Sequence, residues 1–123
     1  MPRGPSDARS AFGVLCALPE ELGPLAERPA ELERVAGVEL RRMRLAGAEV
    51  LAAVGGVGKA RAAQAAAVLI AAGAERGLLV VGVAGALTAG LDPGALVHCT
   101  RAIQADFAVR HDREFEPDPR LLA

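Results

Sequence analysis

The sequence predicts an α/β fold with a mixed central sheet, and three features of the chain lead to that prediction. The stretch over residues 78–87 is a short apolar run that ends in two glycines three positions apart, Gly82 and Gly85. This pattern is typical of a buried strand that stops in a tight turn. An alanine-rich segment over residues 58–72 has the composition of a stable helix and separates this run from earlier strand-like segments. A turn near Gly47 joins two of those segments as an antiparallel hairpin, which makes the sheet mixed.

The composition permits a single domain with a modest core. The chain has 123 residues, 52% of them hydrophobic, with three Phe and neither Trp nor Tyr, so Ala, Val and Leu must form the core. A formal net charge of −1 offers no basic surplus to bind a nucleic-acid backbone or an anionic membrane surface. No apolar run approaches the roughly 18 residues of a membrane helix. We therefore expect neither nucleic acid nor membrane as a partner.

The cysteines and the N-terminal residues indicate the cellular compartment in which the protein is expected. Cys16 and Cys99 lie in hydrophobic strand-like segments without CxxC spacing, so we expect both to be buried free thiols. Free thiols fit a reducing compartment. Residues 1–10 are rich in Pro, Gly, Arg and Ser and are expected to form a flexible tail, while residues 11–18 lack the cleavage pattern of a signal peptide. These features predict a cytoplasmic protein.

The first third of the chain is expected to form a strand, a helix and a polar connection. Residues 11–17 are apolar throughout, as in a strand that is covered on both faces. Pro19 suits the first position of a helix over residues 19–28, with an irregularity at Gly23-Pro24. Residues 29–36 then read as a polar connection.

Two strands are expected over residues 38–45 and 49–54. The apolar positions of the first strand have even numbers up to Leu40 and odd numbers from Met43. Because alternate residues of a strand face opposite sides, this change of phase at Arg41-Arg42 predicts a β-bulge.

The next segments are a helix and the strand that we expect to be central. The helix over residues 58–72 should end at Gly73 in the C′ role, with Val68, Leu69 and Ile70 directed to the core. A buried strand over residues 77–83 follows.

The last third contains a turn and one more strand. Pro93 and Gly94 occupy positions i+1 and i+2 of a type II turn, and residues 95–103 have a strand pattern that includes His98. Residues 104–117 read as a charged loop, and residues 118–122 as the start of a helix. Because this predicted helix has only begun where the sequence stops, we expect that a larger domain has been truncated.

The glycine-rich turn at residues 55–59 fits neither common nucleotide motif. A Walker A loop would need glycine at Ala53 and Ser or Thr at Ala60, and a dinucleotide fingerprint would need glycine at Arg61. Two interpretations remain: a turn whose N–H groups face an anion or a sugar hydroxyl, or a tight turn needed only for packing.

Glu20 and Glu21 follow the first strand, where an α/β enzyme presents a general base. Carboxylates in the first turn of a helix are also favoured by the helix dipole alone. A neighbouring carboxylate should raise the proton affinity of one of the pair, which suits acid–base catalysis.

Other catalytic chemistries find no support in the sequence. His98 and His111 match no metal-site spacing, so we expect no metal ion. Both serines, Ser6 and Ser10, lie in the N-terminal tail, which excludes a serine nucleophile in a Gly-x-Ser-x-Gly elbow.

Four stretches in order carry a family resemblance: residues 13–22, 56–59 leading into the alanine-rich helix, 82–87 and 91–97. Together they resemble the N-terminal half of the purine nucleoside phosphorylase and nucleosidase superfamily over residues 12–107, and most closely its 5′-methylthioadenosine/S-adenosylhomocysteine nucleosidase branch. The resemblance implies a three-layer α/β/α phosphorylase/hydrolase-like fold of which residues 11–123 form the first half. It also implies a homo-oligomer without cofactor that acts in methionine salvage.

The resemblance also implies site residues. Glu21 corresponds to the base that activates water, and Gly56, Val83, Ala84 and Gly85 correspond to substrate-binding positions. The implied reaction is hydrolysis of the N-glycosidic bond of a purine nucleoside through an oxocarbenium-like sugar. This geometry requires the acidic pair and the glycines after residues 78–83 to face one crevice.

The chain departs from the family pattern in three ways. Val83 stands where nucleosidases carry serine, Ala95 replaces an aspartate, and the half that holds the ribose-gripping acidic pair and the purine-protonating aspartate is absent. Relatives that tolerate an apolar residue at Val83, namely futalosine hydrolases and phosphorylase-like proteins of hopanoid pathways, remain alternatives. So do a non-catalytic remnant and a nucleotide-binding half-domain that uses Lys59.

Overall fold

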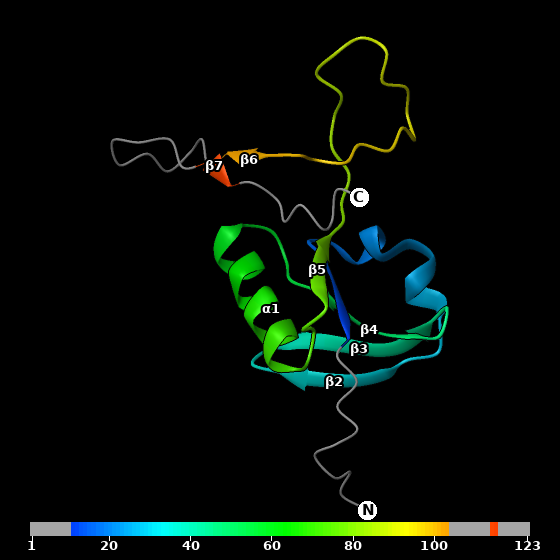
Figure 1. Cartoon of the computed structure of the whole chain (residues 1–123), viewed down its shortest axis with the longest axis vertical. Helices are drawn as coiled ribbons and strands as arrows, with labels where there is room; N and C mark the ends of the chain where they lie inside the picture. The colour runs from blue at the N-terminus through cyan, green and yellow to red at the C-terminus, as the bar shows by residue number, and fades with distance from the viewer. Residues whose placement is uncertain (1–10, 104–113, 116–123) are drawn as a thin grey trace, which may run out of the picture. The chain divides into compact units, whose positions relative to one another are not determined.

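The computed structural model describes residues 11–103 and 114–115. The contacts within the chain divide it into two compact units, one up to Ala84 and one from Gly85 (Figure 1). The expected tail at residues 1–10, the expected helix at residues 118–122 and His111 lie outside the described residues.

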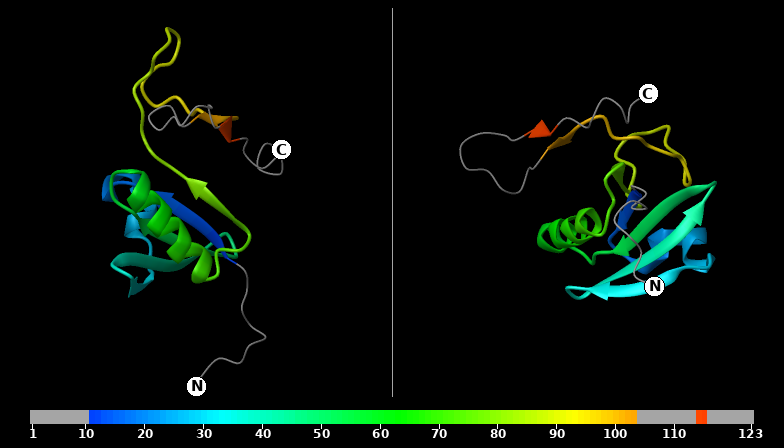
Figure 2. Two further views of the ribbon diagram at one scale, coloured as in Figure 1. Left: turned by 90° about the vertical axis from the view of Figure 1, so that its left-hand side faces the viewer. Right: turned by 60° about the horizontal axis from the view of Figure 1, so that its bottom comes forward.

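The first unit contains the mixed sheet that the sequence predicts. Three neighbouring strands, β4, β1 and β5, run parallel, and β2, β3 and β4 form an antiparallel ribbon (Figure 2). The order across the sheet is β2-β3-β4-β1-β5. The bounds are Phe12–Cys16 for β1, Glu31–Val35 for β2, Val38–Leu45 for β3, Ala48–Val54 for β4 and Gly77–Val80 for β5.

Helical segments lie over both faces of this sheet, which gives three layers. The α-helix α1 (Lys59–Ala71) buries Ala65, Val68 and Leu69 in one core cluster with residues of β1, β3 and β4. On the other face, the 3₁₀ segment η1 (Pro19–Glu27) buries Leu22 in a second cluster with Val14, Cys16, Met43, Val50 and Ala52. The predicted α/β/α arrangement is therefore confirmed for this unit.

The β2–β3–β4 ribbon corrects two predictions. Residues 29–36 do not form a connection throughout, because Glu31–Val35 pairs with β3 as an edge strand. No bulge occurs at Arg41-Arg42, since the register between β3 and β4 is continuous from Leu40 to Leu45. The change of phase has a simpler cause: both faces of β3 are covered, so Leu40 packs under α1 and Met43 under η1.

The two helical segments lie where the sequence predicts them but differ from the prediction in their geometry and in the residues that they bury. η1 begins at Pro19 as predicted, but it is a 3₁₀ segment, and Gly23 leaves helical geometry with φ 52° and ψ −133°. α1 ends next to Gly73, whose φ of 108° confirms its C′ role. Ile70 is 55% exposed and does not reach the core, because the inward stripe of α1 passes through Ala65, Val68 and Leu69.

The strand that we expected to be central and buried is instead at the edge of the described sheet. β5 ends at Val80 rather than at residue 83 and pairs with β1 on one side. Leu79 and Val80 are 57% and 72% exposed, because no further strand of the described sheet covers that side.

The second unit contains little regular structure among its described residues. The type II turn is confirmed, since the Ala95 N–H donates to Asp92 O at 3.0 Å and Gly94 has φ 90°. The strand predicted over residues 95–103 is wrong except at its end: β6 (Ala102–Ile103) pairs with β7 (Glu114–Phe115). A strand needs a paired neighbour and an apolar layer, and His98 and Cys99 are exposed here. Cys99 is thus free as predicted but not buried.

Candidate functional site

The Glu21 carboxylate is held at the corner where β1 leads into η1. β1 ends at Cys16, and Pro19 starts η1, which places Glu21 at the third helical position. From there its Oε2 accepts hydrogen bonds from the main-chain N–H groups of Ala17 at 2.8 Å and Leu18 at 2.9 Å. This is the half of a capping box in which a glutamate binds the free N–H groups at the start of a helix. The Leu18-Pro19-Glu20-Glu21 sequence therefore fixes the orientation of Glu21 locally.

The same carboxylate reaches the end of β5. Val81 N–H donates to Leu15 O at 2.9 Å, so the backbone follows β1 one residue beyond β5. Val83 N–H then points to Glu21 Oε1 at 3.4 Å. A Cβ atom on Gly82 would lie 3.2 Å from Oε1, so the missing side chain leaves room for the carboxylate. Glu21 thus lies at the carboxyl ends of the parallel strands β1 and β5, where α/β sheets bind ligands.

The hydrogen bonds determine the charge of Glu21. Main-chain donors at Leu18, Ala17 and, more weakly, Val83 lower the pKa of the carboxyl group below its ordinary value, and partial desolvation opposes them. The expectation that a neighbouring carboxylate raises proton affinity is wrong for Glu21, because these donors stabilise its ionised form. Glu21 is therefore a carboxylate at neutral pH and can accept a proton.

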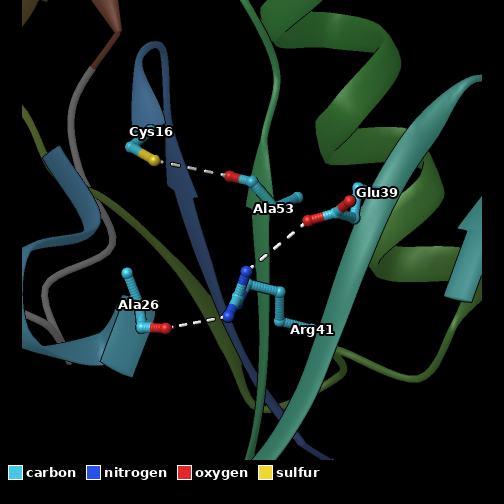
Figure 3. A network of polar contacts seen from close by, with 5 residues as sticks. All are labelled: Cys16, Ala26, Glu39, Arg41 and Ala53. Atoms are coloured by element: carbon cyan, nitrogen blue, oxygen red, sulfur yellow. Dashed lines mark hydrogen bonds and ion pairs between the residues drawn. The ribbon is translucent and has the colours of Figure 1, made fainter. Parts of the chain in front are cut away.

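Cys16 lies beneath this corner without a chemical role of its own. Its thiol donates weakly to Ala53 O, with Sγ 3.7 Å from the oxygen (Figure 3). Burial first, and the charge of Glu21 second, raise the pKa of the Cys16 thiol. A thiol that stays protonated is a poor nucleophile, so Cys16 serves as a packing residue.

The glycine-rich turn lies beside the same corner. Gly55 N–H donates to Cys16 O at 2.8 Å and Gly56 N–H to Ala17 O at 3.0 Å. Ala17 therefore binds Glu21 through its N–H group and Gly56 through its carbonyl. Gly56 has φ 89°, and a Cβ atom there would lie 2.8 Å from Cδ of Arg61. The positive φ, together with the packing under Arg61, therefore explains this glycine. No side-chain hydrogen bond caps the start of α1 at Gly58.

The remaining predicted site residues divide between the two units. Val83 and Ala84 end the first unit, and both are exposed. Gly85 opens the second unit, where a Cβ atom would have nothing within 4 Å. The structure therefore brings Glu21, Gly56 and the Val83 backbone to one corner of the first unit. Gly82, which no sequence motif singled out as a site residue, joins them through its contact with Oε1.

The described residues contain neither a metal-binding cluster nor a membrane-spanning helix. None of their His, Cys, Asp and Glu side chains gather in threes that could hold a metal ion. No described helix is long and apolar enough to cross a bilayer.

A shallow cleft of about 660 Å³ lies between the end of η1 and the β3–β4 hairpin. Its lining includes Arg28, Met43 and Glu49 but not Glu21.

Comparison with known proteins identifies a family and a set of similar folds. The family model described as "Phosphorylase superfamily" matches residues 11–123. None of the curated proteins compared with the chain matches it. Among solved structures, the 5′-methylthioadenosine/S-adenosylhomocysteine nucleosidase from Neisseria meningitidis, in complex with methylthio-immucillin-A, is 28% identical. Its TM-score is 0.75, and the match covers 81% of this chain and 44% of that one.

Two further structures match over more of the chain. The corresponding nucleosidase from S. pneumoniae, with a transition-state inhibitor, is 25% identical with a TM-score of 0.80, over 91% of this chain and 54% of that one. The futalosine hydrolase of Helicobacter pylori is 22% identical with a TM-score of 0.81, over 93% and 55%. At that identity the likeness concerns the fold. The chain spans about half the length of the solved structures that it matches.

Proposed function

The chain belongs to the phosphorylase superfamily, and on that premise we propose that it serves the hydrolysis of the N-glycosidic bond of a purine nucleoside. Glu21 is the proposed base that activates water. The observation that carries the proposal is the ionised Glu21 carboxylate at the carboxyl ends of β1 and β5, with Oε1 toward Val83. We propose residues 11–123 as the N-terminal half of the catalytic domain.

The proposed mechanism makes modest demands on Glu21. Its main-chain donors lower its basicity, which would hinder abstraction of a proton from unactivated water. In a dissociative reaction the purine departs first, and water adds to an oxocarbenium-like sugar that already attracts it. A positioned carboxylate of low basicity suffices to orient that water and to take its proton.

The proposed substrate is a nucleoside of the methylthioadenosine or S-adenosylhomocysteine type. Gly56, Val83, Ala84 and Gly85 are its proposed binding positions. The exposed Val83 side chain supplies an apolar surface and no hydroxyl group. Futalosine is therefore the alternative substrate. We propose that the residues that grip the ribose and protonate the purine belong to the other half of the domain, as the family resemblance implies.

The oligomeric state, the cellular location and the pathway of this activity are also proposals. We propose a homo-oligomer in the cytoplasm that takes part in methionine salvage, with no metal ion or organic cofactor in the reaction. Its partner would be the small nucleoside rather than nucleic acid.

Release of adenine from methylthioadenosine tests the proposal. Together with the other half of the domain, the chain should release adenine, and Glu21→Ala should abolish the release. S-adenosylhomocysteine and futalosine, assayed in parallel, identify the favoured substrate. If the chain cleaves none of the three even together with that other half, the interpretation as a non-catalytic member of the family replaces the proposal.

Phosphorolysis is a second candidate reaction because Arg61 lies over the glycine-rich turn. Its Cδ and guanidinium are close to the backbone of Gly56, beside the corner that carries Glu21. A guanidinium at this position would attract a phosphate nucleophile. Dependence of the cleavage on phosphate, with 5-methylthioribose 1-phosphate as the sugar product from methylthioadenosine, would favour phosphorolysis. Cleavage that proceeds equally without phosphate supports hydrolysis.

A further inference from the structure

A chain of hydrogen bonds leads from Gly55 of the glycine-rich turn to Glu21. Gly55 N–H donates to Cys16 O at 2.8 Å. Cys16 O belongs to the same peptide group as Ala17 N–H, which donates to Glu21 Oε2 at 2.8 Å. The peptide group between Cys16 and Ala17 is therefore bound by the turn on one side and by the carboxylate on the other.

A second chain of the same kind starts at Gly56. Gly56 N–H donates to Ala17 O at 3.0 Å. Leu18 N–H, in the same peptide group as Ala17 O, donates to Glu21 Oε2 at 2.9 Å. When the carbonyl of a peptide group accepts a hydrogen bond, its N–H is polarised and the bond that it donates becomes stronger. Both donors to Oε2 are thus held and strengthened by the glycine-rich turn.

The two bonds from the turn continue the pairing between β1 and β4. The ladder of these strands ends where Cys16 pairs with Val54. The next two bonds hold the chain at the point where it leaves β1 for η1. η1 itself anchors this point weakly, because Leu22 is its one buried residue. The position of the two peptide groups therefore depends on the turn.

The turn comes this close to β1 and α1 because Gly55 and Gly56 carry no side chains. A Cβ atom on Gly55 would lie 3.0 Å from Cβ of Ala65 on α1 and 3.2 Å from Cδ1 of Leu15 on β1. Gly56 has φ 89°, and a Cβ atom there would lie 2.8 Å from Cδ of Arg61. Alanine at Gly55 would therefore displace the turn by contact, and alanine at Gly56 would favour a different backbone conformation.

We infer that Gly55 and Gly56 are positioning residues: through the two peptide groups they hold the Glu21 carboxylate in its orientation at the end of β1. The inference rests on the proposed function, because Glu21 is the proposed base. The same bonds limit what else the turn can bind, since the N–H groups of both glycines face the end of β1 and neither is free for an anion or a sugar hydroxyl. Gly56 stays a proposed binding position through contacts other than its N–H.

The titration of Glu21 reports on the two peptide groups. The N–H groups of Leu18 and Ala17 are the first causes of its lowered pKa. The ionisable groups on the surrounding elements are Glu20 on η1, the Cys16 thiol on β1, and Lys59 and Arg61 in the first turn of α1. Residues 77–84 contain no ionisable side chain.

The test compares Gly55→Ala and Gly56→Ala with Gly58→Ala in the full chain. Gly58 belongs to the same turn and has φ 109°, so alanine there strains the backbone as it does at Gly56. A Cβ atom on Gly58 would have nothing within 4 Å, and the Gly58 N–H makes no hydrogen bond to β1. The control therefore introduces the same side chain and similar strain without touching the two hydrogen-bond chains.

NMR would follow the pH titration of the Glu21 carboxyl carbon and the hydrogen exchange of the two amides that donate to Oε2. Gly55→Ala and Gly56→Ala should each raise the pKa of Glu21 toward its ordinary value, because weaker donors stabilise the ionised form less. Each should also accelerate exchange of the two amides about tenfold. Gly58→Ala should leave both readouts at the parent values.

The unaltered chain allows a measurement that depends on no substitution. Scalar couplings across hydrogen bonds should join the amide nitrogen of Gly55 to the carbonyl carbon of Cys16, and that of Gly56 to the carbonyl carbon of Ala17. Absence of these couplings overturns the inference even if neither variant folds. Inorganic phosphate should leave the couplings in place, and their loss on its addition would show an anion site instead.

An unchanged Glu21 titration in either folded variant overturns the inference, and so does an equal shift in Gly58→Ala. None of these readouts requires turnover, so absence of adenine release would contradict the proposed function and leave this test intact. Where the chain and the other half of the domain release adenine, Gly55→Ala should move the acidic limb of the pH profile of kcat/KM to higher pH. The reason is that a base of raised pKa is protonated at a higher pH.

Discussion

The Glu21 carboxylate combines a structural task with the proposed chemical one. Its Oε2 satisfies two N–H groups at the start of η1, and its Oε1 meets the backbone after β5. A side chain that performs the first task is oriented before any substrate binds, which is the preorganisation that catalysis requires. The associated loss of basicity is tolerable in a dissociative cleavage.

Gly82→Ala tests how closely the carboxylate must approach β5. The added Cβ would lie 3.2 Å from Oε1, tighter than ordinary van der Waals contact, so the carboxylate should move away from Val83. We expect the pKa of Glu21 to rise toward its ordinary value, because the Val83 donor is lost. A carboxyl titration followed by NMR measures this, and an unchanged titration in the folded variant would show that the contact is unimportant.

The sequence predicted the place of Glu21 but not its contacts. Leu18-Pro19-Glu20-Glu21 after an apolar strand is a local signal, because strand end, helix start and carboxylate are all within a few residues. The role of Gly82 depends on a contact between residues that are far apart in the sequence. No local pattern contains that information.

At the scale of elements, local turn chemistry was informative where it was recognised. Ala46 and Gly47 join β3 and β4 with φ of 49° and 82°, and Ala36 and Gly37 join β2 and β3 in the same way with φ of 49° and 80°. Positive φ at both positions is typical of the two-residue hairpin turn. The second Ala-Gly pair could therefore have revealed β2, but the charged residues of this edge strand concealed it.

The two neighbouring residues Leu69 and Ile70 test which face of α1 is buried. Leu69 is fully buried and Ile70 is 55% exposed, although we expected both to face the core. Leu69→Ala should lower the free energy of unfolding by about 2–5 kcal/mol, because it leaves a cavity. Ile70→Ala should change it by less than about 1 kcal/mol. Urea unfolding of both variants measures the difference, and equal losses would contradict the helix orientation.

At the scale of the molecule, the order of elements was sufficient to predict the mixed three-layer arrangement of the first unit. Alternating strands and helices, with one hairpin, allow few other arrangements. The prediction for residues 95–103 was wrong because an apolar strand pattern also requires a neighbouring strand and a layer to cover it. A local pattern cannot supply either.

The exposed edge of β5 has a consequence for association. Leu79 and Val80 are exposed beside a strand edge that has no neighbour in the described sheet, and such edges promote pairing between chains. We expect self-association that increases with concentration and that Val80→Lys weakens. Leu32→Lys, at an exposed site on the opposite edge strand β2, serves as the control. Sedimentation velocity distinguishes these outcomes, and a monomer at all concentrations would refute the expectation.

The central claim is that Glu21, and not its neighbour, activates water at the ends of β1 and β5. The most direct measurement is kcat/KM for adenine release from methylthioadenosine by Glu21→Gln and by the matched variant Glu20→Gln. Loss of a general base should lower the value for Glu21→Gln by about 10²–10⁴-fold, while Glu20→Gln should stay near the parent value. Equal activity of the two variants would contradict the claim.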